Sequence, residues 1–168
     1  MNLPEVITPS LIDHIRQSYR LPWNGLHGWD HWVRVWEIGQ RLSALNGTNQ
    51  IVVALFAFTH DMARENEGSD LEHGPRAARR IRSELQGTYF KLPTFELGLL
   101  TEAVEKHTDG DTVANLTIQT CWDSDRLDLG RAWITPHPDR LCTPEAKDPA
   151  MIEWAHRRSV AWREASYH

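Results

Sequence analysis

The sequence predicts an all-α protein, a single-domain helical bundle, and three observations support this prediction. Between turn signals such as Asn46-Gly47 and Asp109-Gly110, the chain runs in segments of helical length. Apolar residues in these segments recur at the three- and four-residue spacing of one helical face. The length of 168 residues, with no repeat or linker, fits one domain with a sizeable core.

The first expected helix covers residues 10–19, with Ser10 as its N-cap. A second helix is expected to begin at the N-cap Asp30 and to end near residue 45, where Gly47 suits the position after a helix. One turn before the apolar face of this helix lies His31, so a histidine is expected at the end of a buried face. The expected apolar face comprises Val35, Ile38, Leu42 and Leu45.

The apolar run from Ile51 to Phe58 is the most hydrophobic part of the chain. Its two alanines and the helical patterns on both sides favour a helix that is buried all round. The run ends in His60-Asp61, and burial of the Asp61 carboxylate is costly unless a cation pairs with it. This pair therefore indicates a bound cation at the end of the helix.

Two later helices repeat the pattern of a histidine on an apolar face. In the helix expected over residues 71–85, His73 aligns with Ala77 and Ile81. In the helix expected from Thr94, the apolar stripe continues into His107. Both histidines are therefore expected to point into the bundle.

The last part of the expected bundle holds an aspartate on an apolar face. Over residues 118–129, Asp125 lies on the stripe, whereas Asp123 points about 140° away from Ile118 and is expected to face solvent. After a loop that contains three prolines, residues 148–164 form a final helix that is expected to pack against the core.

Six side chains of metal-ligand type thus share apolar faces or the ends of buried helices. For any one of them, a core histidine with satisfied hydrogen bonds or a capping aspartate is the commoner explanation. For all six, that explanation requires several unpaired buried polar groups in one small domain, whereas a shared divalent ion removes the difficulty. Imidazole and carboxylate ligands suit Mn, Fe, Co, Ni, Zn or Mg. The expected metal ligands are His31, His60, Asp61, His73, His107 and Asp125.

Cationic side chains beside these ligands suit a phosphorylated substrate. Arginine binds phosphate in a bidentate manner, and Arg64 and Arg34 are the expected catalytic arginines, with a solvated surface charge as the alternative for each. Arg79 and Arg80 are expected to face solvent. His27, in the loop before the second helix, is expected either to line the mouth of the site or to donate a proton to a leaving group.

Composition and motifs exclude several other classes of protein. The net charge of −5 argues against a protein that coats nucleic acid, but leaves small anionic substrates open. Cys121 and Cys142 lack C-x-x-C spacing, no signal peptide is evident, and no apolar run could span a bilayer, so a soluble cytoplasmic protein is expected. The sequence has no G-x-G-x-x-G, Walker loop, H-E-x-x-H or G-x-S-x-G motif.

At these residues the chain resembles the HD-domain superfamily, and specifically its small, stand-alone bacterial members. The H…HD…D hallmark is carried by His31 in H-W-V-R-V, by His60-Asp61 in H-D-M-A-R, and by Asp125 in D-S-D-R-L-D. The resemblance covers residues 26–130 and implies a helical bundle of the HD type. We expect residues 1–168 to form one such domain, in which residues 131–168 are a C-terminal loop and helix.

The resemblance also implies a reaction. It implies a metal-dependent phosphohydrolase in which metal-bound hydroxide attacks the phosphate ester of a nucleotide or another small phosphorylated metabolite, with Asp61 as a catalytic residue. In HD-GYP phosphodiesterases additional histidines hold a second metal, and His73 and His107 fall in the order that this requires, with Asp61 bridging. The short spacing from His107 to Asp125 and the missing G-Y-P motif leave one or two ions open.

Two alternatives stay open at this point. The same ligand order occurs in mixed-valent diiron oxygenases of the HD fold, although the lysine-rich motif after His107 is missing here. The second alternative is a metal- or nucleotide-binding module without turnover. The sequence leaves the oligomeric state open, including a homo-oligomer.

Overall fold

The protein is all-α, as the sequence predicted. The computed structural model describes residues 3–166, and within this range it consists of helices and loops without a β-strand. The only β-type pairing among the described residues is an isolated bridge between Gln86 and Phe90. None of the described helices is long and apolar enough to cross a membrane.

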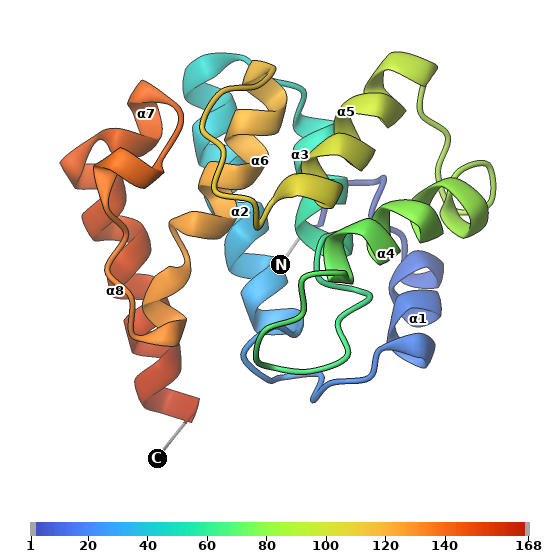
Figure 1. Ribbon diagram of the computed structural model, residues 1–168, viewed down its shortest axis with the longest axis horizontal. Helices are drawn as coiled ribbons and strands as arrows, with labels where there is room; N and C mark the ends of the chain where they lie inside the picture. Colours follow the sequence, from blue (N-terminus) through green and yellow to red (C-terminus); the bar gives the residue numbers. More distant parts are fainter. Residues whose placement is uncertain (1–2, 167–168) are drawn as a thin grey trace.

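Four helices form the centre of the bundle (Figure 1). α3 (Gln50–Thr59) packs against α2 (Trp29–Asn46), α5 (Thr94–Lys106) and α6 (Leu116–Arg126). Every residue of α3 from Val52 onwards is buried, which confirms the expectation of a helix enclosed on nearly all sides. α3 therefore delivers the residues that follow it into the middle of the molecule.

Two further helices cover the side of the bundle next to α5 (Figure 1). α4 (His73–Arg80) continues into a single π-helical turn, η1 (Ile81–Leu85), and packs along α5. α1 (Pro9–Ser18) lies across α4 on its other side. The N-cap of α1 is Thr8, not Ser10 as expected: the Thr8 hydroxyl accepts from the Leu11 amide, and a proline occupies the first helical position.

α2 departs from its expected pattern at both ends. Gly28 occupies the N-cap position in place of Asp30, whose carboxylate instead accepts a hydrogen bond from Trp162 Nε1 at 3.1 Å. Leu45 is 62% exposed and not part of the buried face. Gly47 ends the helix with φ 72°, the left-handed conformation that favours glycine, as expected.

The C-terminal part forms a layer over α2 and α6 (Figure 1). It consists of η2 (Leu129–Ala132), η3 (Pro138–Arg140), α7 (Pro144–Lys147) and α8 (Pro149–Ser166). α8 packs against η2 and α7, and the layer has a small core of its own against α2. The buried side chains of this core are Ile38, Leu42, Leu127, Leu141, Ala146, Met151 and Ala155.

The expectation that Asp123 faces solvent is wrong. Its carboxylate is fully buried and accepts hydrogen bonds from the amides of Cys142 and Thr143, at 2.6 and 2.8 Å, and from the Thr143 hydroxyl at 2.8 Å. Asp123 points away from the central helices, as the helical spacing predicts, but the C-terminal layer covers that face of α6. Asp123 therefore anchors this layer.

Candidate metal centre

The six predicted ligands come from five helices and meet in one place. His31 lies in the first turn of α2, and Asp125 lies in the last turn of α6. His60 and Asp61 directly follow α3, His73 begins α4, and His107 directly follows α5. All six side chains are buried or nearly so, and their ligand atoms fall into groups close enough to share an ion.

The first group surrounds one oxygen of Asp61. His31 Nε2 lies 3.1 Å from His60 Nε2, and Asp61 Oδ2 lies 3.6 and 3.5 Å from these two nitrogens. Asp125 Oδ1 lies 3.4 Å from His31 Nε2 and 3.9 Å from His60 Nε2. Ligands bound about 2.1 Å from one ion are about 3.0–3.4 Å apart, so this spacing fits a shared cation.

The second group surrounds the other oxygen of the same carboxylate. Asp61 Oδ1 lies 3.1 Å from His73 Nε2 and 3.6 Å from His107 Nε2. The two histidine nitrogens are 2.8 Å apart. Asp61 therefore faces two groups of ligands, one with each oxygen.

A close helix contact brings the second group together. A Cβ atom at Gly74 would lie 2.7 Å from the carbonyl oxygen of Val104 and 2.8 Å from that of Glu105. Glycine is thus required where α4 approaches the end of α5. The contact sets the distance between His73, one residue before the glycine, and His107.

Each of the four histidines has its Nδ1 atom bound to an acceptor. His31 Nδ1 lies 2.8 Å from Asp128 Oδ2, and His107 Nδ1 lies 2.7 Å from the carbonyl oxygen of Val104. The Nδ1 atoms of His60 and His73 likewise face backbone carbonyl oxygens. A carbonyl accepts only, so Nδ1 carries a proton and the Nε2 atom of each ring points into the cluster.

The electrostatics favour a cation at this position. Burial lowers the pKa of His31 and lowers that of His60 to about 4, so both rings are neutral at pH 7. Burial opposes ionisation of Asp125, but Arg131, His60 and His31 together lower its pKa to about 2. Asp125 Oδ1 is buried and accepts no hydrogen bond from any described residue. Neutral imidazoles, ionised carboxylates and an unsatisfied oxygen are the donor set that a divalent ion requires.

Two residues that the sequence analysis missed support the cluster. Asp128 is fully buried, and its carboxylate binds His31 Nδ1 and the guanidinium of Arg34, whose Nε and Nη2 lie 2.7 and 2.9 Å from its two oxygens. Arg131 Nη2 lies 3.5 Å from Asp125 Oδ1. The signal for Asp128 was present, because it is the third aspartate of D-S-D-R-L-D.

The expected catalytic residues take two different positions. Arg34 is buried against Asp128, and its guanidinium also stacks on Trp162. Arg64 Nε lies 3.1 Å from Asp61 Oδ1, directly beside the second group of ligands. Arg64 therefore contacts the cluster directly, whereas Arg34 contacts Asp128, the residue that orients His31.

His27 lies next to the cluster, at its more exposed edge. Its ring centroid is 6.3 Å from that of His31, and its Nδ1 atom is hydrogen-bonded to the Glu67 carboxylate. Tyr19 donates a hydrogen bond to the His27 carbonyl at 2.8 Å. Burial lowers the pKa of His27. The sequence analysis did not identify Glu67 or Tyr19, which come from loops and chain segments far apart.

The fold is that of HD-type proteins. No protein-family model and no curated protein matches the sequence. Among solved structures, the chain is similar to the crystal structure, at 1.45 Å resolution, of a predicted HD superfamily hydrolase from an uncultured Thermotogales bacterium. The TM-score is 0.70 at 21% sequence identity, and the similarity covers 99% of this chain and 98% of the other. Fold and ligand geometry thus agree with the resemblance seen in the motifs.

Proposed function

We propose that the protein is a metal-dependent phosphohydrolase that cleaves a phosphate ester of a small metabolite, such as a nucleotide. One observation carries this proposal: four buried histidines direct their Nε2 lone pairs at the two oxygens of one aspartate. Because burial lowers the pKa of both His31 and His60, their neutral Nε2 atoms face each other at 3.1 Å with lone pairs that would repel without a cation. The fold of a predicted HD superfamily hydrolase supports the same assignment.

We propose two ions that share Asp61. His31, His60, Asp125 and Asp61 Oδ2 would hold the first, and His73, His107 and Asp61 Oδ1 would hold the second. When bound, the ions supply Lewis acidity toward a phosphoryl oxygen and a lowered pKa for a coordinated water. The ligands identify no particular element, so Mn, Fe, Co, Ni, Zn and Mg all remain candidates.

Two arginines are placed to receive the phosphoryl group. Arg64 and Arg131 lie beside Asp61 and Asp125, and their guanidinium groups oppose the negative charge that develops as the ester bond breaks. Arg131 is further fixed by donation from its Nε to the Leu26 carbonyl at 3.1 Å. We assign Arg34 a positioning function, since its guanidinium is bound to Asp128.

His27 is the proposed proton carrier. Glu67 accepts from Nδ1 and so fixes the ring, which leaves Nε2 to exchange a proton. Hydrolysis joins a water oxygen to phosphorus and breaks the phosphorus–oxygen ester bond. His27, neutral because burial lowers its pKa, takes up a proton at Nε2 from the attacking water and gives it to the departing oxygen, which leaves as a neutral alcohol.

The test is a screen of phosphate mono- and diesters with protein loaded with Mn²⁺, Co²⁺ or Mg²⁺. We expect release of phosphate or of a phosphomonoester, with loss of at least a thousandfold in kcat for Asp61→Asn and of about a hundredfold for His27→Gln. As a matched control, Asp139→Asn removes an exposed carboxylate and should leave the rate unchanged. Hydrolysis that survives Asp61→Asn in a folded, pure protein would refute the assignment.

The second ligand group also favours another candidate, a diiron oxygenase of the HD fold. That chemistry requires two adjacent metal positions with a shared carboxylate, and Asp61 with His73 and His107 meets the requirement. Iron-loaded protein that consumes oxygen and hydrolyses no phosphate ester would establish this function. Ions that bind without either reaction would instead indicate a binding module.

A further inference from the structure

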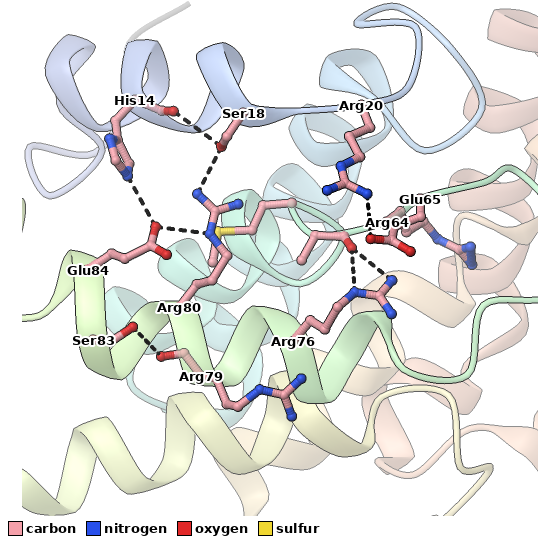
Figure 2. A pocket seen from close by; sticks show the side chains of 12 residues that line it. His14, Ser18, Arg20, Arg64, Glu65, Arg76, Arg79, Arg80, Ser83 and Glu84 are labelled. Atoms are coloured by element: carbon pink, nitrogen blue, oxygen red, sulfur yellow. Dashed lines mark hydrogen bonds and ion pairs between the residues drawn. The ribbon is translucent and has the colours of Figure 1, made fainter.

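A polar pocket lies between α1 and α4 (Figure 2). It is about 500 Å³ in volume, within the range of small-molecule sites, and its walls are α1, α4 and the segment after Asp61. His73 and Ala77 face the bundle from α4, whereas the side chains of Arg76, Arg79 and Arg80 line this pocket. None of the six ligands lines the pocket, and Arg64, which does, connects it to Asp61.

Arginines dominate the lining of this pocket. Five arginines line it, although the whole chain has a net charge of −5. Four of them pair with carboxylates, in the pairs Arg20–Glu65, Arg64–Asp61, Arg76–Asp70 and Arg80–Glu84, and Arg79 leaves an excess of positive charge. The five are Arg20, Arg64, Arg76, Arg79 and Arg80, and they come from three separate parts of the chain. A positive pocket on an acidic protein attracts small anions in particular.

Several of these guanidinium groups are held in place by neighbours. Arg80 donates from Nε to Glu84 at 2.9 Å and from Nη2 to the Ser18 hydroxyl at 2.8 Å, so it links α4 to α1. Arg20 donates to Glu65 from Nη1 at 2.6 Å. The expectation that Arg80 faces solvent is therefore wrong, because α1 packs over it.

The pocket keeps donors available for a ligand. Arg79 is exposed, and no carboxylate among residues 3–166 lies within ion-pair distance of it. Arg80 Nη1 and Arg20 Nη2 make no hydrogen bond to any described residue, and neither is buried. Fixed guanidinium groups with free N–H atoms match the oxygens of phosphate groups.

We propose that this pocket binds a phosphate-bearing anion, either free pyrophosphate or the phosphates of a nucleotide, separately from the metal centre. The pocket and the centre share a wall. Arg76 donates twice to the Ala63 carbonyl, at 3.2 and 3.0 Å, and Ala63 lies two residues after Asp61. An anion bound to Arg76, Arg79 and Arg80 therefore contacts the segment that carries Asp61 and Arg64, and is placed to act as an effector of that centre.

The test is calorimetric titration of inorganic pyrophosphate into the metal-loaded protein at 0.15 M salt. We expect binding that is at least tenfold weaker in the Arg79→Gln/Arg80→Gln variant, because two of the arginines that line the pocket are lost. The matched control is Arg82→Gln/Arg157→Gln, which removes two exposed arginines outside the pocket and should bind as the parent protein does. Metal content is measured on every variant, since an intact metal centre should be retained.

Three outcomes would overturn the proposal: no pyrophosphate binding, equal binding by the pocket variant, or equal loss in the control variant. Equal binding by the pocket variant would assign the anion to the metal centre. Titration of adenosine 5′-diphosphate distinguishes a free pyrophosphate ligand from the phosphate groups of a nucleotide. A nucleotide that binds more than tenfold tighter than pyrophosphate assigns the pocket to nucleotides, and equal affinity assigns it to the phosphate groups alone; both results support the proposal.

Discussion

Asp128 should control both the stability of the fold and the affinity for metal, and Asp128→Asn tests this at nearly constant shape. The fully buried carboxylate accepts from His31 and twice from Arg34, at 2.7 to 2.9 Å. Arg131 Nη1 lies 3.6 Å away. Asparagine retains one acceptor oxygen but removes the negative charge between the buried guanidinium groups of Arg34 and Arg131.

The magnitude follows from these contacts. Removal of one partner of a buried ion pair costs about 3–5 kcal/mol of unfolding free energy, and Asp128 is fully buried. Loss of the group that orients a histidine ligand lowers metal affinity by about 10- to 100-fold. We therefore expect a loss of about 3 kcal/mol in stability and a tenfold or larger rise in the Kd for Mn²⁺.

The assay is urea unfolding of chelator-treated protein, followed by Mn²⁺ titration of the folded variant. Asp139→Asn is the matched control, because its side chain is 88% exposed and should change neither quantity. If Asp128→Asn keeps the stability and the Mn²⁺ affinity of the parent protein, the positioning function of Asp128 is refuted.

Three further predictions concern packing and pH. Gly74→Ala should lower the unfolding free energy by about 1–3 kcal/mol, since its Cβ would lie 2.7 Å from the Val104 carbonyl oxygen. The control Gly98→Ala, whose Cβ would have nothing within 4 Å, should leave the unfolding free energy unchanged or raise it. Thermal unfolding measures both. Asp123→Ala should cost about 2–3 kcal/mol and increase amide exchange at Thr143, because buried donors lose their acceptor; unchanged exchange would contradict the anchoring function. Without metal, stability should rise from pH 5 to 6.5: burial lowers the folded pKa of His60 to about 4 and also lowers those of His31 and His27, so the unfolded chain binds more protons in this window. The raised pKa of His107 opposes part of this rise. Chemical denaturation at both pH values checks the sign, and a fall in stability would contradict it.

Helical spacing located the six predicted ligands because all of them lie on helices or within two residues of a helix end. His31, His73 and Asp125 each follow the period of an apolar face, and that face determines the direction of the side chain. The same spacing placed Asp123 on the opposite face of α6, which is correct in angle. What it could not show is that a later part of the chain covers that face.

The residues that sequence reasoning missed lie where periodicity has no meaning. Asp128 and Arg131 follow α6 in a turn and a 3₁₀ helix, so their directions depend on tertiary packing. Glu67 reaches His27 from a loop forty residues away. Periodicity did not indicate Asp128 as the partner of Arg34 for the same reason, and the Arg34 guanidinium was expected to bind substrate.

The most direct test of the central claim is the metal content of the purified protein after loading with Mn²⁺ and removal of free ions, measured by native mass spectrometry. We predict two ions per chain, and one ion in a His73→Gln/His107→Gln variant that keeps the first ligand group. A parent protein that retains no ion, or a variant that retains both, would contradict the shared site at Asp61.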